Sequence, residues 1–185
     1  DVFIDMGVAV ARTIEPGDPL DPATRFGAMV SEAQMRTTLR YIDSARAEGG
    51  AELLAGGRVR EETGGFYVAP TIFAIGPDAT LAREEVFGPV LGILDFADEA
   101  EANRIANDTV FGLAAGDWTP DLARPNRAAE TLRAGLVWVN GWDACDITMP
   151  FGGFKQSGFG RDRSLHALEK YADLKAVTIS FGAEA

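Results

Sequence analysis

Short apolar runs that alternate with helical segments constrain the fold of this chain most. Two runs, residues 90–94 and 136–139, are rich in branched side chains and have glycine or proline beside them. Runs of this length are typical of buried strands. Between them, an acidic cap at residues 98–101 opens a helix that would bury Ala102, Ile105 and Ala106. A second helix follows Thr119 and is expected either to kink at Pro125 or to begin there. This alternation predicts an α/β fold with a largely parallel sheet flanked by helices.

The first half of the chain carries further element signals. A helix opens the chain, with Val2, Phe3, Met6, Val10 and Ile14 on one apolar face. Because no capping residue precedes Asp1, we expect a piece of a longer chain. A capping box at residues 31–34 begins a second helix, and residues 58–65 suggest a hairpin-like excursion. Strand-like residues on both sides of Pro70 predict an edge strand at 71–74.

Composition limits the class of protein. A chain of 185 residues can form one domain, or one domain with an appendage. Its 28 acidic against 17 basic residues give a net charge of −11, which argues against nucleic acid and anionic membranes as partners. No apolar stretch approaches the roughly 20 residues of a membrane span. A single cysteine excludes an internal disulfide framework and fits a reducing cytoplasm.

An acidic, aromatic stretch at residues 84–90, Glu-Glu-Val-Phe-Gly-Pro-Val, leads directly into the first apolar run. Loops that feed buried strands in α/β proteins often contact ligands, so Glu84, Glu85 and Phe87 are candidates. The alternative is a solvated acidic turn with Phe87 as a core anchor. These residues alone leave both interpretations open.

A glycine-rich stretch at residues 150–161 follows the second apolar run and Asn140. It lacks both the Gly-Lys-Ser/Thr ending of a P-loop and a Gly-x-Gly-x-x-Gly placed between a strand and a helix. A structural turn that packs against another domain is therefore favoured over a phosphate cradle. His166, the only histidine, has no partner cluster and is expected to be structural or solvated, so no metal site is predicted.

Several motifs together resemble the NAD(P)-dependent aldehyde dehydrogenases. They occur in the family's order and spacing, and the resemblance covers essentially the whole chain: residues 84–90, residues 107–115, Val-Trp-Val-Asn at 137–140, Pro-Phe-Gly-Gly at 150–153, Lys155, Ser157-Gly158 and Gly160-Arg161. Residues 146–148 and 164–171 are most similar to γ-glutamyl-γ-aminobutyraldehyde dehydrogenases of putrescine breakdown. Semialdehyde and betaine aldehyde dehydrogenases are the alternatives within the family.

The resemblance implies a reaction and a division into parts. The family oxidises an aldehyde to a carboxylic acid through a Cys thiohemiacetal and thioester, with hydride transfer to NAD or NADP. It implies an incomplete catalytic domain at residues 1–157, a helix packing on an absent cofactor domain at 158–172, and an oligomerisation strand and tail at 173–185. The Rossmann-like domain, the nucleophilic Cys and the general-base Glu are expected upstream of Asp1. No catalytic residue is therefore assigned here, and the segment alone is expected to be inactive.

The resemblance also assigns cofactor contacts. It implies that Glu85 accepts hydrogen bonds from the two hydroxyls of the nicotinamide ribose. A carboxylate suits this role because it only accepts hydrogen bonds and can take both donors at once. Phe87 would contact the nicotinamide ring, and Gln34 is a weaker candidate contact. Glu84 receives no role as a base and is expected to be solvated.

The loop after Asn140 would line the aldehyde tunnel. Phe151 and Trp142 supply aromatic walls, and Cys145 lies on the same loop. Asp146 and its neighbour Asp143 would favour an amine-bearing aldehyde; the alternative is that both acids only solvate the loop. These acids also disfavour a thiolate at Cys145, so it is not assigned as the nucleophile.

The tail alternates strictly from residue 175 to 181, with Val177, Ile179 and Phe181 on one face. An alternating strand at a chain end needs a partner, and the resemblance implies that it joins a neighbouring subunit in a dimer or tetramer. A different class of function remains open. A truncated chain or pseudoenzyme kept as an assembly module would also explain the missing nucleophile and the self-associating tail, although such a module has no need for Glu85, Phe87 and Phe151.

Overall fold

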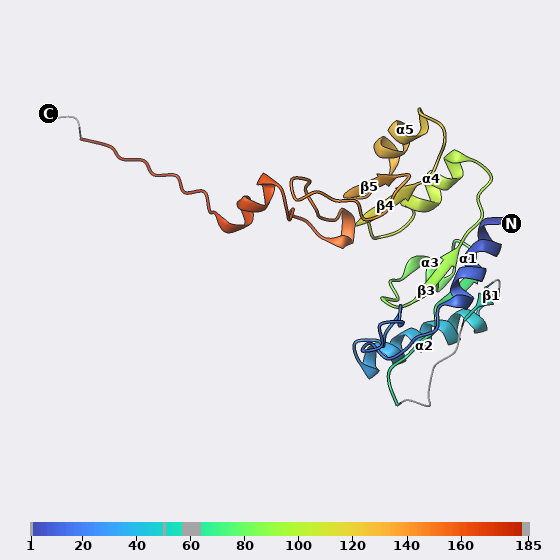
Figure 1. Cartoon of the computed structure of the whole chain (residues 1–185). Coiled ribbons are helices and arrows are strands. Elements are labelled where there is room, and N and C mark those ends of the chain that lie inside the picture. The colour runs from blue at the N-terminus through green and yellow to red at the C-terminus, as the bar shows by residue number, and fades with distance from the viewer. Residues whose placement is uncertain (1, 50, 57–63, 183–185) are drawn as a thin grey trace. The chain divides into compact units, whose positions relative to one another are not determined.

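The computed structural model describes residues 2–49, 51–56 and 64–182. The chain divides into two compact units, Asp1–Asp98 and Glu99–Ala185, and each is described by itself. Elements α1 to β3 belong to the first unit, and α4 to the C-terminus belong to the second (Figure 1). The excursion expected at residues 58–65 lies almost entirely outside the described residues.

The strands of the first unit that the structure describes form one three-stranded sheet. Its elements are α1 (Val2–Thr13), α2 (Glu32–Ala47), β1 (Glu52–Ala55), β2 (Thr71–Ala74), α3 (Thr80–Arg83) and β3 (Val90–Ile93). The order is β1-β2-β3, with β1 antiparallel and β3 parallel to β2. The expected edge position of residues 71–74 is therefore wrong. Pro70 stands just before β2, so its missing N–H costs no ladder bond, and the next N–H, of Thr71, donates to Pro89.

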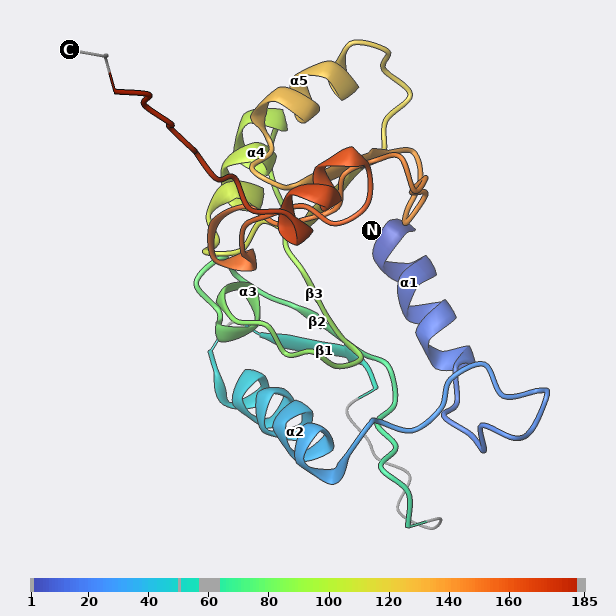
Figure 2. The same cartoon turned by 90° about the vertical axis from the view of Figure 1, so that its left-hand side faces the viewer.

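Helices α1 and α2 lie on opposite faces of this sheet (Figure 2). Side chains alternate along β2, so Phe73 and Ile72 point to different faces. Phe73 is fully buried and packs with Ile42 and Ala45 of α2, forming the core of the unit. Ile72 instead lines an open apolar groove beside α1. The start predicted for α2 is confirmed, because the hydroxyl of Ser31 accepts the N–H of Gln34 at 3.2 Å.

Two apolar segments are more exposed than their patterns predicted. Helix α1 forms as expected, but four residues of its predicted apolar face are 59–74% exposed: Val2, Phe3, Met6 and Val10. Phe3, Met6 and Val10 line a groove of about 630 Å³ with residues 88–91. Strand β3 was expected to be buried, yet it is the last described strand of its sheet, and Leu91 is 51% exposed. The sequence pattern therefore predicted these two elements correctly, but it did not predict how much of their apolar surface is exposed.

The second unit contains a parallel strand pair joined by a helix. Its elements are α4 (Glu99–Asn107), β4 (Ala114–Asp117), α5 (Arg124–Thr131), β5 (Leu136–Val139) and the 3₁₀ helices η1 (Lys155–Ser157) and η2 (Leu165–Tyr171). Strands β4 and β5 pair in parallel, with Ala114 opposite Leu136. Helix α5 begins with Pro125 in its first turn, as expected. On α4, Ala106 is exposed rather than buried. Two of the three strand pairs among the described residues are parallel, which agrees with the predicted α/β fold.

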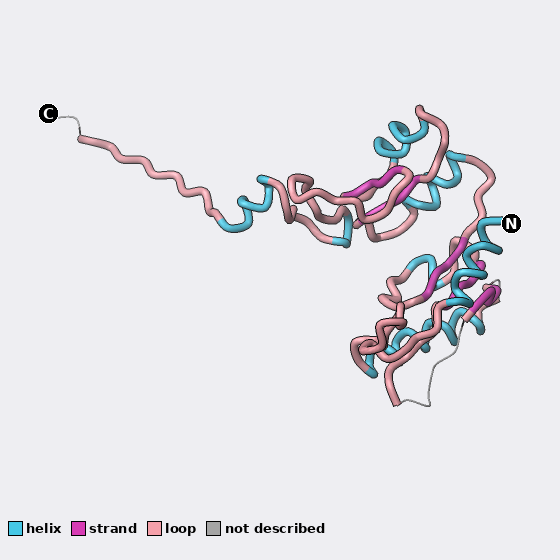
Figure 3. The backbone as a smooth tube through the Cα atoms, in the orientation of Figure 1, coloured by secondary structure: helices cyan, strands magenta, loops and turns pink. Residues whose placement is uncertain are grey.

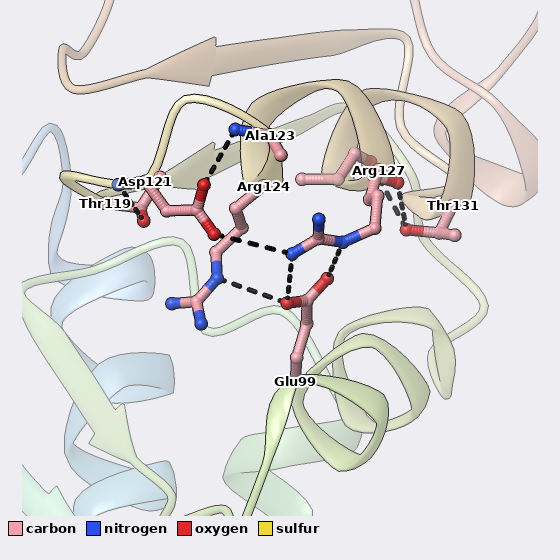
Figure 4. A network of polar contacts seen from close by, with 8 residues as sticks. Glu99, Thr119, Asp121, Ala123, Arg124, Arg127 and Thr131 are labelled. Carbon is pink, nitrogen blue, oxygen red and sulfur yellow. Dashed lines mark hydrogen bonds and ion pairs between the residues drawn. The ribbon is translucent and has the colours of Figure 1, made fainter.

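A charge network joins α4 to α5 (Figure 4). The carboxylate of Glu99 accepts hydrogen bonds from Nε of Arg124 at 3.2 Å and from Nε and Nη2 of Arg127 at 2.7 and 2.8 Å. The hydrogen bonds from Arg127, with the positive charges of both arginines, lower the pKa of Glu99 to about 2. Asp121 adds a longer ion pair to Arg127 at 3.8 Å. The network fixes the start of α4 against the start of α5.

The helix expected within residues 158–172 takes a different form. It is a 3₁₀ helix, η2, whose N-cap hydroxyl, Ser164, accepts the N–H of His166. Its apolar residues Leu165 and Leu168 are 83% and 63% exposed in this chain, and Ala172 is also exposed. The expectation that residues 158–172 pack on another domain stays a prediction.

The tail forms no strand among the residues described after η2 (Figure 3). Val177, Ile179 and Phe181, the predicted strand face, are 71–90% exposed. A lone alternating segment has no ladder to join, so pairing with another chain stays a prediction.

Candidate functional site

The loop between α3 and β3 displays its acids and its aromatic ring outward. Glu84, Glu85 and Phe87 are exposed, and the ring of Phe87 is among the most accessible, with 77% of the residue exposed. Val86 is the inward residue, at 9%. The interpretation of Phe87 as a core anchor is therefore wrong. The loop is anchored through Val86 and presents a carboxylate and a ring to its surroundings.

Phe87 adopts a left-handed backbone conformation, with φ at +52°. This region costs an ordinary residue about 1–2 kcal/mol, and a bulky side chain adopts it only where surrounding contacts enforce it. The strain lies at a residue that the sequence had marked as a ligand contact. Strained residues of this kind concentrate at functional sites.

Helix α2 supplies contacts that hold this conformation. The side-chain amide of Gln34 donates to the carbonyl oxygens of Val86 at 3.1 Å and Phe87 at 2.9 Å. Tyr41, seven residues further along α2, donates to Glu84 at 2.7 Å. Gln34 lies at the end of the predicted capping box, and its amide N–H groups bind the loop. Its expected contact with a cofactor stays a prediction.

The second constellation lies after β5, where Asn140 ends the strand. Its side chain accepts the N–H of Thr119 at 2.8 Å and donates to the carbonyl of Thr119 at 2.9 Å, which ties this loop to the segment that follows β4. Asn140 has φ at +51°, a conformation that asparagine tolerates better than most residues. The start of the loop is therefore fixed at both its backbone and its side chain.

Three tryptophans gather at this loop. Trp142 stacks on Trp118, with ring centroids 6.4 Å apart, and tilts against Trp138, with centroids 4.8 Å apart. The indole N–H of Trp138 donates to the carbonyl of Ala144 at 3.2 Å, which holds the loop across its base. Trp142 remains 63% exposed. The structure thus places one predicted tunnel residue on a braced, accessible aromatic surface.

Cys145 and Asp146 follow on the same loop. Cys145 is half-buried, and Asp146 is exposed. One carboxylate oxygen of Asp146 accepts both the hydroxyl of Thr148 at 2.6 Å and its N–H at 2.8 Å. These hydrogen bonds lower the pKa of Asp146, so it stays negative at neutral pH. Asp146 closes its own turn while retaining its charge.

The glycine-rich stretch is a structural turn. The ammonium of Lys155 donates to the carbonyls of Asn107 at 2.8 Å and Thr109 at 3.0 Å, so the cation that a phosphate would need is already engaged. Gly112 donates to the hydroxyl of Ser157 at 2.9 Å. The turn packs on residues 107–112 of its own unit, and the expected packing against another domain stays a prediction. Phe151 is half-buried, pairs with Asp162 and lies under the guanidinium of Arg163.

Comparison with known proteins decides the family. A model of the aldehyde dehydrogenase family matches residues 1–177. The chain belongs to the aldehyde dehydrogenase family. It spans 34% to 38% of the length of the relatives described below.

Members of this family resemble the chain closely in sequence and in structure. It is 51% identical to a betaine aldehyde dehydrogenase of Agrobacterium fabrum, over 90% of this chain and 34% of the relative. A betaine aldehyde dehydrogenase of Sinorhizobium fredii is 48% identical over 98% of this chain and 38% of the relative. Among solved structures, γ-glutamyl-γ-aminobutyraldehyde dehydrogenase from Burkholderia cenocepacia matches with 54% identity and a TM-score of 0.90, over 95% of this chain and 36% of that one. An indole-3-acetaldehyde dehydrogenase in complex with NAD⁺ matches with 51% identity and a TM-score of 0.92, over 98% and 37%.

Sequence reasoning missed the supporting residues of both aldehyde dehydrogenase loops. Tyr41 carried one usable signal, because it lies two helical turns from Gln34 on the same face of α2. Trp118 and Trp138 carried no signal of their contacts with Trp142, since the residues come from separate segments and these rings meet only in the fold. Glu85 and Phe87 belong to the first unit, whereas the predicted tunnel residues belong to the second.

Two further features are absent from the described part of the chain. None of its described helices combines the length and apolarity that a membrane span requires. Nor do three or more His, Cys, Asp or Glu side chains gather there in a way that could hold a metal ion.

Proposed function

We propose that this chain is the C-terminal portion of an NAD(P)-dependent aldehyde dehydrogenase that oxidises an aldehyde to a carboxylic acid. The observation that carries the proposal is the braced loop at residues 84–89, which presents the exposed carboxylate of Glu85 and, two residues on, the exposed ring of Phe87 on a strained backbone. The nucleophile and the general base come from outside this chain, and the chain contributes to binding and assembly.

The loop residues fit the nicotinamide end of the cofactor. Glu85 is exposed, and its carboxylate can accept hydrogen bonds from two neighbouring ribose hydroxyls at once. Phe87 offers an exposed ring face, and an aromatic contact adds about 0.5–1.5 kcal/mol beyond burial. When bound, NAD or NADP supplies the acceptor for the hydride. The chain itself binds and orients that end of the cofactor.

The loop at residues 140–151 selects the aldehyde. Trp142 provides an accessible aromatic surface, and Asp146 keeps a negative charge close to it in sequence. Phe151 and Cys145 add further walls. Aromatic faces and carboxylates both attract ammonium groups, so an aminoaldehyde such as γ-glutamyl-γ-aminobutyraldehyde fits this lining, and a quaternary ammonium aldehyde is the alternative.

The experiment uses the longest natural polypeptide that contains this chain. Reduction of NAD and NADP is followed with γ-glutamyl-γ-aminobutyraldehyde, betaine aldehyde and indole-3-acetaldehyde, and again in Glu85→Gln. We expect oxidation of the aminoaldehyde and a KM for NAD raised about tenfold in Glu85→Gln, because charged hydrogen bonds contribute about 1.5–3 kcal/mol. Glu52→Gln, at an exposed position of β1, is the matched control. No turnover with any aldehyde, or unchanged NAD kinetics in Glu85→Gln, would contradict the proposal.

A non-catalytic assembly module is the second candidate. It is favoured by the exposed alternating face of the tail, Val177, Ile179 and Phe181. In either case the tail would pair with a neighbouring subunit in a dimer or tetramer, because an unpaired alternating strand is completed by strand addition. Sedimentation of the polypeptide with and without Ile179→Asp tests the pairing. A stable assembly without any aldehyde oxidation would favour the module.

A further inference from the structure

Helix α2 and the residue that caps its end, Glu48, contact the segment from α3 to β3 at four successive points. The carboxylate of Glu48 accepts the N–H of Thr80 at 3.2 Å, at the start of α3. Tyr41 then binds Glu84, and Gln34 binds the carbonyls of Val86 and Phe87. The fourth point is Thr38, which is fully buried and lies against Gly88.

These contacts come from one stripe of the helix. Gln34, Thr38 and Tyr41 are separated by four and three residues, which places them on one helical face, and Glu48 is the residue that caps the end of the helix. Over its first three contacts the loop runs the opposite way to the helix, from Glu48 through Tyr41 to Gln34, and Gly88 then lies against Thr38. One rigid element therefore sets the position of the whole loop.

We propose that Gln34 is a positioning residue that holds Glu85 and Phe87 in the arrangement that binds the nicotinamide end of the cofactor. This inference rests on the proposed function. An amide nitrogen carries two hydrogens, and two carbonyls that flank the strained residue receive them. Tyr41 assists by binding Glu84, so Glu85 is the acid of the pair that Tyr41 does not bind.

The close approach of Thr38 explains the glycine of the motif. A Cβ added to Gly88 would overlap the hydroxyl of Thr38 and come within 2.9 Å of its methyl group. That hydroxyl donates to the carbonyl of Gln34 at 3.0 Å, so it cannot turn aside without losing a buried bond. Hydrogen bonds from Gln34 therefore hold the residues before Gly88, and close packing against Thr38 holds Gly88 itself.

The test replaces Gln34 in the longest natural polypeptide. Gln34→Glu keeps the size of the side chain but replaces the amide with a carboxylate. A carboxylate has no hydrogens to donate to the carbonyl oxygens of Val86 and Phe87. Gln34→Met is the second variant, which removes the donors without adding charge. Gln156→Glu, an exposed glutamine of η1, is the matched control. Three quantities are measured: hydrogen exchange at residues 84–91, the dissociation constant of NAD, and the KM values of NAD and aldehyde.

We expect exchange at residues 84–91 to accelerate at least tenfold, since about 1.4 kcal/mol of two lost hydrogen bonds corresponds to a factor of ten. The NAD dissociation constant and KM should rise by about the same factor, while the aldehyde KM stays unchanged. Gln156→Glu should change none of these. A merely structural role of Gln34 would lower Tm without separating the two KM values.

Other results would overturn the inference. Unchanged exchange in both variants contradicts it, and if NAD affinity nevertheless falls, Gln34 contacts the cofactor directly. Faster exchange with unchanged NAD affinity also contradicts it, provided that Glu85→Gln weakens NAD binding. If Glu85→Gln leaves NAD affinity unchanged as well, the proposed function itself is wrong and the inference falls with it.

Discussion

The phenol of Tyr41 donates a hydrogen bond of 2.7 Å to a carboxylate oxygen of Glu84. This bond raises the pKa of Tyr41 above its ordinary value of 10.0, chiefly because the carboxylate accepts the phenolic proton's hydrogen bond. It also separates two adjacent acids that look equivalent in the sequence. Glu84 is engaged by α2, and its exposed neighbour Glu85 is the acid that we propose as the cofactor contact.

Tyr41→Phe should weaken the fold slightly and remove an alkaline pH dependence. The pKa of Tyr41 is raised in the folded state, so the stability that the bond adds is fully present below pH 10 and is lost as pH rises above it. We expect Tyr41→Phe to lower Tm by about 2 °C at pH 7. The difference from the unmodified chain should shrink in the alkaline range. Tyr171→Phe, at an exposed position, should show neither effect.

The Glu99 network predicts an acid dependence of the opposite sign. The pKa of Glu99 is lowered from 4.5 to about 2, so its contribution is present above pH 4.5 and is lost as pH falls toward 2. Glu99→Gln should lower Tm at pH 7 and lose this effect near pH 2. Thermal unfolding at several pH values measures it, with Glu130→Gln on α5 as the control. An equal Tm difference at pH 7 and pH 2 would show that charge is not responsible.

Replacing Phe87 separates its backbone strain from its ring. Phe87→Ala removes the ring but keeps a side chain at φ +52°, whereas Phe87→Gly removes both ring and strain. We expect Phe87→Gly to exceed Phe87→Ala in unfolding free energy by about 1 kcal/mol, measured in urea. Both should weaken NAD binding in the longest natural polypeptide. A glycine variant less stable than the alanine variant would mean that the left-handed conformation carries no strain.

Asn140→Asp should destabilise the start of the second loop. The substitution keeps the acceptor for the N–H of Thr119 but replaces the donor with an oxygen that faces the Thr119 carbonyl. Leaving such a partly buried carbonyl unpaired costs about 1–3 kcal/mol. Urea unfolding measures the loss. Asn126→Asp, exposed on α5, should cost nothing because a negative charge suits the start of a helix.

Gly135→Ala should disturb the contact between β5 and the glycine-rich turn. A Cβ at position 135 would overlap the carbonyl oxygen of Gly152, which is backbone and has little room to shift. We expect a loss of about 1–3 kcal/mol in unfolding free energy. Gly141→Ala is the matched control, because its Cβ would meet only the Val139 carbonyl, at 3.9 Å. Equal stability of the two variants would show that the turn moves freely.

Local signals in the sequence predicted the elements well. Ser31 marked the start of α2, and Pro125 marked the start of α5, because caps and prolines act on the first turn of a helix. The alternation of short apolar runs with helices likewise gave the α/β class. The loop residues Glu85 and Phe87 were found by motif, and the structure exposes both.

Contacts between residues far apart in the sequence could not be predicted from local patterns. Tyr41 and Glu84 are 43 positions apart, and Gln34 and Phe87 are 53 apart, so no spacing rule connects them. The central position of β2 depends on which strands pair on either side of it, which the proline next to Thr71 did not reveal. The exposure of α1, β3 and η2 could not be predicted either. An apolar stripe indicates that a face tends to be buried, but it does not identify the element that buries it.

The single contact stripe on α2 restricts how this helix can change over evolution. An α-helix turns by about 100° per residue, so one inserted or deleted residue between Gln34 and Tyr41 would rotate one contact away from the loop. Substitutions on the opposite face leave the stripe intact, but changes of length do not. The loop that the helix supports therefore fixes the number of residues between the contact points on α2. Natural length variation should instead fall in the turn before it, at residues 16–30, where no such alignment is at stake.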